Sequence, residues 1–349
     1  MKLIRLVLIK LTISESSNAC KMSAQGHDDG RDDFIPITTV HAFPINSFIE
    51  NIAVRPTGQL LLTVNNKCEL IQFDPNTEAA PCLVHVFPAS VSGIVEVQDD
   101  VFYVSCGTIG EKGTWAVYKV DMSPFMADAA GNVQTPAKIS KHVDVPDALF
   151  LNGSALLSYS NGTILLAESI LGAIYSVNVH SATVKLWLQH EALAKVTDNP
   201  MMPGVNGIKF HNGYLYLSNT DAKKFLRASI TGTGDATGII EVVQENLNVD
   251  DFCFDSEGSA YLTTHAFQSI VKLRNDGLRT RLAGGPEDTV VAGTTAAAFG
   301  RTSQDQTIIY VTTTGGMINP VAGKIGPGRV LKLDVGHTST PDFRIGKVF

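Results

Sequence analysis

Residues 52–73 read IAVRPTGQLLLTVNNKCELIQF. A short apolar segment leads into a turn at Pro56-Thr57-Gly58, and two strand-like segments follow, Gln59 to Val64 and Glu69 to Phe73. Apolar and polar residues alternate in the last segment, which is typical of a strand with one buried face. Glycine-containing turns join antiparallel neighbours. The stretch therefore predicts one small antiparallel β-sheet.

The same order of short strands and turns recurs five more times along the chain, at a spacing of roughly 40–60 residues. The later copies begin near Gly93-Ile94, Asn152-Gly153, Asn206-Gly207, Asp250-Asp251 and Ala296. One such sheet cannot bury both of its faces, whereas sheets stacked radially cover one another. The repeat therefore predicts an all-β protein, a six-bladed β-propeller of four-stranded antiparallel blades. Two packed β-sandwiches are the structural alternative, which the regular repeat disfavours.

The chain has one strand-like segment outside the six copies, Thr38 to Phe43. We expect it to complete the last blade and close the ring. The predicted boundaries are residues 36–349 for the propeller and 1–35 for an N-terminal tail or atypical signal segment. Met1 to Ile13 has the basic start and apolar run of a signal peptide, but Arg5 and Lys10 interrupt that run. The sequence thus leaves the location open between the secretory pathway and the cytoplasm.

Composition excludes some functional classes. The 349 residues are 44% hydrophobic and 17% charged, which suits a large folded core. The formal net charge is −7 and no cluster of Lys and Arg offsets it, so nucleic acid is not an expected partner. No apolar run approaches the roughly 18 residues that a membrane span needs. The oligomeric state is not predicted.

The chain has five cysteines, an odd number, so at least one thiol is not paired within the chain. Cys68 and Cys82 flank the turn-like Asp74-Pro75-Asn76. If these residues form a hairpin, the two cysteines can face each other and form a disulfide. The alternative is two buried thiols without a bond. Cys253, between two phenylalanines, is expected in the core.

Polar residues stand where the innermost strand begins in four of the six copies. They are Glu50, Asn152, Asn206 and Asp250. Because inner strands of a propeller line its central channel, we expect these side chains to converge at one mouth. Carboxylate and amide oxygens suit Ca²⁺, Mg²⁺ or Mn²⁺. Buried together, they need a cation, water or a polar substrate. The alternative is that each Asn-Gly is a hairpin turn.

These four residues resemble those of the senescence-marker-protein-30/gluconolactonase family of six-bladed propellers, over most of the chain from about Ile37 to Asp334. The resemblance implies that Glu50, Asn206 and Asp250 hold a divalent metal, that Asp250 also acts as a general base, and that Asn152 helps to bind substrate.

This chain departs from the lactonase pattern at three positions. Phe150 replaces an Arg, Asp251 replaces a Gly, and Asn51 follows the Glu in place of Gly-Pro. The departures disfavour hydrolysis of sugar lactones and indicate a more apolar pocket.

Three further segments are similar to a fungal branch of this superfamily, FIENIAVR at 48–55, DDF at 250–252 and AAAFGRT at 296–302. That branch looks like the one that contains the hetero-Diels–Alderases of tropolone sesquiterpenoid biosynthesis, which join a tropolone-derived ortho-quinone methide to the polyene humulene. The resemblance implies a pericyclase that acts on small hydrophobic substrates and requires no cofactor. The alternatives are a metal-dependent lactonase or esterase with a bound divalent cation, and a non-catalytic ligand-binding propeller.

A pericyclase needs oriented reactants, fixed donors and a proton source rather than a nucleophile. We expect the amides of Asn152 and Asn206 to donate hydrogen bonds, and Glu50, Asp250 or Asp251 to transfer protons. His265, which follows Thr263-Thr264, is a further candidate acid, donor or ligand, although a lone histidine is more often structural. The candidate aromatic wall consists of Phe48, Phe150, Phe299 and Trp115.

Overall fold

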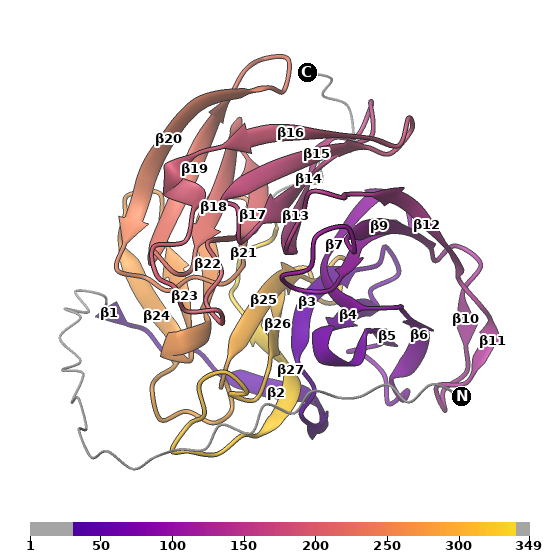
Figure 1. Cartoon of the computed structure of the whole chain (residues 1–349). Coiled ribbons are helices and arrows are strands. Elements are labelled where there is room, and N and C mark those ends of the chain that lie inside the picture. The colour runs from indigo at the N-terminus through magenta and orange to yellow at the C-terminus, as the bar shows by residue number, and fades with distance from the viewer. Residues whose placement is uncertain (1–30, 340–349) are drawn as a thin grey trace, which may run out of the picture.

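A computed structural model describes residues 31–339. Six four-stranded antiparallel sheets are arranged in a ring (Figure 1), which confirms the predicted six-bladed β-propeller. Residues 1–30, on which the signal-segment prediction falls, lie outside the described part. Within residues 31–339 no helix is long and apolar enough to cross a membrane.

The blades follow one another along the chain. Blade 1 consists of β3 (Ile49–Val54), β4 (Leu60–Val64), β5 (Glu69–Phe73) and β6 (Cys82–Val86). Blade 2 consists of β7 (Ser90–Gln98), β8 (Val101–Gly107), β9 (Ala116–Asp121) and β12 (Lys138–Asp144). Blade 3 consists of β13 (Leu151–Ser158), β14 (Thr163–Glu168), β15 (Ala173–Asn178) and β16 (Thr183–Gln189). Blade 4 consists of β17 (Val205–His211), β18 (Tyr214–Asn219), β19 (Lys224–Ile230) and β20 (Ala236–Glu245). Blade 5 consists of β21 (Phe252–Phe254), β22 (Ala260–Thr264), β23 (Ser269–Leu273) and β24 (Arg279–Gly284). Blade 6 consists of β25 (Thr294–Phe299), β26 (Ile308–Thr313), β27 (Pro327–Asp334) and β2 (Ile37–Ile45).

The remaining elements lie between or beside these strands. They are the hairpin β10 (Met126–Ala127) and β11 (Val133–Thr135), the short strand β1 (Arg31–Asp32), and the single-turn 3-10 helices η1 (Asn65–Lys67), η2 (Glu191–Leu193) and η3 (His265–Phe267).

The N-terminal strand closes the ring. β2 pairs antiparallel with β27 and forms the outermost strand of blade 6, as predicted for Thr38 to Phe43. Since β27 lies near the C-terminus, blade 6 joins the two ends of the chain. β1 pairs parallel with β24 and adds a fifth strand to blade 5.

The hydrophobic core lies between neighbouring blades rather than at the centre of the ring. Six clusters of buried apolar residues are found in the described part of the chain, and each joins two adjacent blades. Blade 3 meets blade 4 through Leu165, Ile174, Leu215 and Leu226, for example. The repeated apolar strands are therefore explained by radial stacking, which covers both faces of each sheet.

Closer to the axis, a hydroxyl of each blade donates a hydrogen bond to a backbone carbonyl of the next. The six bonds are Thr63 to Ser92 (2.8 Å), Ser92 to Leu151 (2.5 Å), Ser169 to Val205 (2.6 Å), Ser218 to Asp250 (2.6 Å), Thr263 to Thr295 (2.8 Å) and Thr295 to Ile49 (2.6 Å). Together they connect all six blade interfaces in a circle. All six hydroxyls are buried, and these bonds satisfy them.

The inner strands share a second feature, an irregularity near the start. In β3, β7, β13, β17 and β25 the register with the neighbouring strand shifts at the second residue or just after it. A β-bulge of this kind re-aims a side chain and is common next to functional sites. Glu50, Asn152 and Asn206 stand at these positions. In blade 5 Asp250 and Asp251 stand directly before β21.

Of the two possibilities that the sequence left open for Cys68 and Cys82, the structure has the one without a disulfide. Cys68 and Cys82 are both free. Asp74-Pro75-Asn76 does lie in a hairpin connection, but Cys82 is paired with Gln72, whereas Cys68 precedes Glu69, which is paired with Val86. The two thiols are therefore at opposite ends of the β5–β6 hairpin. Cys253, predicted in the core, is half-buried and packs against the apolar cluster between blades 5 and 6, and burial raises the pKa of its thiol far above the usual value.

Candidate functional site

The four polar residues at the starts of the inner strands are all buried. Their exposed fractions are 8% for Glu50, 2% for Asn152, 3% for Asn206 and 7% for Asp250. They come from blades 1, 3, 4 and 5, so the ring brings together residues that are up to 200 positions apart in the sequence. None of the four lies in a hairpin turn, which removes the alternative reading of Asn152-Gly153 and Asn206-Gly207.

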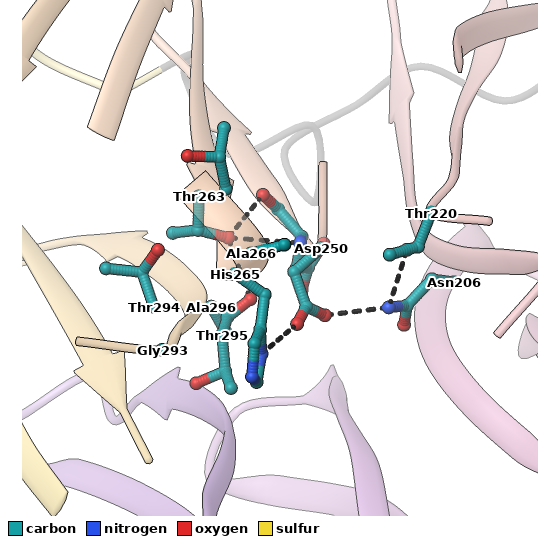
Figure 2. Close-up of polar contacts among 12 residues, drawn as sticks. Asn206, Thr220, Asp250, Thr263, His265, Ala266, Gly293, Thr294, Thr295 and Ala296 are labelled. Atoms are coloured by element: carbon teal, nitrogen blue, oxygen red, sulfur yellow. Dashed lines mark hydrogen bonds and ion pairs between the residues drawn. The ribbon is translucent and has the colours of Figure 1, made fainter. Parts of the chain in front are cut away.

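Asp250 is the centre of a hydrogen-bonded group (Figure 2). Its Oδ1 accepts from Asn206 Nδ2 at 2.7 Å, and its Oδ2 lies 3.0 Å from His265 Nδ1. The amide of Asn206 also donates to Thr220 Oγ1 at 3.1 Å. Burial raises the pKa of Asp250, and its contact with His265 opposes that rise. The structure thus joins three predicted residues, from two blades, in one contact network.

Glu50 faces this group from blade 1 without a hydrogen bond from any residue in the described part of the chain. Burial raises the pKa of Glu50 well above its ordinary value, and the negative charges of Asp250 and Asp251 raise it further. A buried carboxyl without a cationic partner is most stable when it carries its proton. Glu50 therefore has the properties of a general acid.

His265 begins η3, directly after β22, and the residue is 8% exposed. While Nδ1 contacts Asp250, Nε2 is buried and has no hydrogen-bond partner in residues 31–339. The ring of Phe48, from blade 1, lies 6.2 Å from the ring of His265. A buried nitrogen without a partner is costly, so a polar ligand atom or water would satisfy it.

Asn152 and Asp251 differ in their surroundings. The Asn152 side chain makes no hydrogen bond with the described residues and is available to a ligand. Asp251 lies in an ion pair with Lys209, whose Nζ is 2.7 Å from both carboxylate oxygens, and it accepts from the backbone N–H of Phe252 at 2.9 Å. Asp251 is thus held by neighbouring protein groups, whereas Asn152 is not.

The structure adds two residues to the ring of polar side chains. Ser92 and Thr295 occupy the equivalent bulge positions of blades 2 and 6, so all six blades place a polar side chain there. Ser92-Gly93 has the same polar-Gly pattern as Asn152-Gly153, and this signal was available in the sequence. Thr295 precedes an alanine and carried no such signal.

The same end of the propeller holds a cavity of about 580 Å³. It is lined by Phe150, by Ile109-Gly110 and Ile170 in turns of blades 2 and 3, and by residues 195–198 and 200–203 of the connection between β16 and β17. We call it the blade-3/4 cavity. Of the predicted aromatic wall, Phe150 lines this cavity and Phe48 lies beside His265.

The other two predicted wall residues are in the core instead. Trp115 is fully buried beneath Phe150, and its Nε1 donates to the carbonyls of Leu149 (2.9 Å) and Thr108 (3.1 Å). Phe299 packs against Tyr261 between blades 5 and 6. Both side chains belong to the packing between blades.

Two of the three residues suggested for a divalent cation, Asn206 and Asp250, are hydrogen-bonded to each other in the arrangement found. Both oxygens of Asp250 are hydrogen-bonded, and Asn206 turns its amide nitrogen, not its oxygen, toward Asp250. No group of three or more His, Cys, Asp or Glu side chains in residues 31–339 is placed to hold a metal ion. Whether Glu50, Asn206 and Asp250 bind a cation stays a prediction, and we derive no step through one.

Fold and site together define a β-propeller with a buried acid, amide and imidazole group where the inner strands begin. No family model matches the chain. It is similar to a Phoma protein named "Putative hetero-Diels-Alderase", 26% identical over 311 residues, covering 80% of this chain and 86% of that protein. It is also similar to a Sarocladium schorii protein named "Putative hetero-Diels-Alderase asR5", 25% identical over 338 residues, covering 84% and 81%.

Among solved structures, the fold is similar to that of regucalcin, a calcium-binding protein from Agrobacterium tumefaciens. The TM-score is 0.62 at 16% identity, covering 90% of this chain and 98% of that chain. At this identity the likeness establishes the fold alone. The comparisons confirm both resemblances noted from the sequence, to propellers of the senescence-marker-protein-30 type and to proteins named as hetero-Diels–Alderases.

Proposed function

We propose that the protein is a pericyclase that catalyses an intermolecular hetero-Diels–Alder cycloaddition between a tropolone-derived ortho-quinone methide and a humulene-type terpene in fungal secondary metabolism. The names of the two curated relatives support the reaction class. Within the molecule, the supporting observation is that the polar group contains both an acid with a raised pKa, Glu50, and the buried imidazole of His265, whose Nε2 has no hydrogen-bond partner in residues 31–339.

In the first step the quinone methide forms from a hydroxymethyl tropolone by loss of water. Glu50 transfers its proton to the leaving hydroxyl as the carbon–oxygen bond breaks. His265 Nε2 accepts the proton of the neighbouring ring hydroxyl, and Asp250 stabilises the resulting imidazolium through Nδ1. One proton leaves the ring hydroxyl and one reaches the departing oxygen, so the products are neutral quinone methide and water. General acid–base help of this kind contributes roughly 10²–10⁴ in rate.

In the second step the alkene adds across the heterodiene, and one carbon–carbon and one carbon–oxygen bond form without proton transfer. The protein contributes orientation of the two reactants and hydrogen bonds to the oxygen of the heterodiene. Asn152 is suited to donate to that oxygen because its amide has no other partner in the described residues. The proton on His265 then returns to Glu50, which restores the starting state.

The proposal is tested with the purified protein, a hydroxymethyl tropolone and humulene, with the adduct measured by liquid chromatography and mass spectrometry. We expect the adduct to form faster than without protein and at the same rate after treatment with EDTA. Loss of turnover on chelation, or hydrolysis of gluconolactone without any adduct, would instead support the metal-dependent lactonase.

A binding propeller without catalysis is distinguished by Asn152→Ala. Because the Asn152 amide is buried at the proposed reaction site, the variant should lose most of the rate enhancement. Removing one donor to a developing oxyanion costs roughly 10²–10³ in other enzymes. A binding module that uses its outer rim would retain its affinity in this variant.

A further inference from the structure

The blade-3/4 cavity is joined to the candidate site by the chain itself. Phe150 lines the cavity and stands two residues before Asn152. Pro203 also lines it and stands three residues before Asn206. At about 3.3 Å per residue, these walls lie within roughly 10 Å of the two asparagines along the backbone. The cavity therefore opens beside the polar group but has a lining of its own.

That lining is mostly apolar and extends onto the surface. Phe150, Ile170, Met201 and Met202 contribute to it. Three apolar residues of the lining are exposed at the surface, with exposed fractions of 45% for Ile109, 66% for Val196 and 55% for Met201. Such a cluster is unusual on a protein surface unless something binds there. The volume of about 580 Å³ lies within the roughly 300–1,000 Å³ common for small-molecule sites.

Two buried carboxylates hold the walls in place. Glu168 accepts from the backbone N–H groups of Leu149 (3.0 Å), Phe150 (2.6 Å) and Leu171, and thus fixes both Phe150 and the turn that carries Ile170. Asp221 accepts from the N–H groups of Val196 (2.8 Å) and Thr197 (2.7 Å) and from the Thr197 hydroxyl (2.7 Å). In the described part of the chain, no hydrogen bond joins Glu168 or Asp221 to a candidate catalytic residue. Their contacts give this cavity a fixed shape.

We infer that the blade-3/4 cavity binds the apolar alkene reactant, a polyene hydrocarbon of terpene size, while the polar heterodiene occupies the group around Glu50 and Asp250. This inference rests on the proposed function. An apolar polyene offers no hydrogen bonds, so it gains affinity only by burial against apolar walls, which this cavity supplies. Methionine side chains adapt to an irregular ligand, and Phe150, which replaces an arginine of lactonases, presents a ring instead of a charge.

The test uses the fluorescence of Trp115, which packs against Phe150 with ring centroids 5.8 Å apart. The chain has only two tryptophans, so Trp187→Phe leaves Trp115 as the single reporter. In this background humulene alone is titrated, without the tropolone. We expect a saturable change in Trp115 emission. Ile170→Gln and Met201→Glu should each weaken binding about tenfold, because a polar group replaces an apolar wall.

Met126→Glu is the matched control, since Met126 is 61% exposed, comparable to Met201, and lies on β10 away from the cavity. It should leave binding unchanged. In turnover, the cavity variants should raise KM for humulene and leave KM for the tropolone unchanged. The inference is overturned if Trp115 shows no saturable response, or if Ile170→Gln and Met201→Glu bind humulene as Met126→Glu does. Saturable binding that depends on the cavity, but with no adduct from the unmodified protein, would contradict the proposed reaction and leave the cavity as an apolar-ligand site.

Discussion

At the scale of single residues, the site differs from a simple collection of polar side chains because each member has a different set of partners. Asp250 has both oxygens engaged, Asp251 is neutralised by Lys209, and Glu50 has neither a hydrogen bond nor a cation in the described residues. The differences separate a proton donor from groups that orient or structure the site.

Glu50→Gln tests this assignment. The variant keeps the shape of the side chain and removes its acidic proton, so the dehydration step should slow by roughly 10²–10⁴. In the unmodified protein the rate should fall as pH rises through the raised pKa of Glu50, because the acid form is then lost. The pH–rate profile of adduct formation measures both effects, with the exposed Glu78→Gln as the control. A Glu50→Gln variant of full activity would exclude Glu50 as the acid.

The same substitution has a consequence for stability. A carboxyl whose pKa is raised by folding binds more protons in the folded than in the unfolded state. Its contribution is therefore full at low pH and is lost as pH rises toward the folded-state pKa, by up to about 1.4 kcal/mol per pH unit. Glu50→Gln should gain stability relative to the unmodified protein over this pH range in urea unfolding.

At the scale of strands, the bulge near the start of five of the six inner strands explains how the site is built. Glycine follows the bulged residue in blades 2, 3 and 4 because the neighbouring inner strand passes very close. A Cβ atom on Gly153 would lie 2.4 Å from the carbonyl oxygen of Asn206 and 2.9 Å from the Cα of Gly207. Blades 1 and 5 have Asn51 and Asp251 there, and each accepts a hydrogen bond from the next backbone N–H. These two departures from the lactonase pattern thus have a local structural reason.

Gly153→Ala should accordingly push Asn206 out of place. We expect a loss of about 1–3 kcal/mol in the free energy of unfolding, as for other overpacked sites, together with reduced turnover. Gly232→Ala is the control, since a Cβ atom there meets nothing within 4 Å. Equal unfolding midpoints for the two variants would show that the inner strands tolerate the extra methyl group.

The repeat and four of the six polar residues could be predicted from the sequence, because the order of short strands and turns recurs with each blade and the polar residue has the same place in it. The partners of those residues could not. The ion pair between Lys209 and Asp251 joins two blades, and no sequence pattern near either residue indicates it. Glu168 was missed for a related reason, since a carboxylate that binds only backbone N–H groups has no sequence motif. The sequence left a Cys68–Cys82 disulfide open because the turn sequence alone did not fix the register of β5 and β6.

At the scale of the whole molecule, the site exists only while the ring is closed, because no blade holds more than two of the residues Glu50, Asn152, Asn206, Asp250 and His265. Closure depends on β2 joining blade 6, on the six apolar interfaces and on the circle of hydroxyl bonds. Thr295 connects blade 6 to blade 1, the interface between the first and last blades.

Thr295→Val therefore probes closure. The change keeps the side-chain volume but leaves the carbonyl of Ile49 without its donor, which should cost about 1–3 kcal/mol. Thr183→Val, on the exposed outer strand β16, should change the unfolding free energy far less. Denaturant unfolding of both variants measures the difference, and a Thr295→Val protein as stable as Thr183→Val would mean that the hydroxyl circle contributes little to closure.

The central claim is that two reactants meet in one fixed arrangement beside Glu50, Asn152 and Asp250, and the stereochemistry of the product tests it most directly. The adduct of a hydroxymethyl tropolone and humulene is analysed by chiral chromatography, with and without the protein. We predict a single enantiomer with the unmodified protein and a racemate without it. A racemic adduct in the presence of the protein would contradict the claim, because reactants held in the site would be presented on one face only.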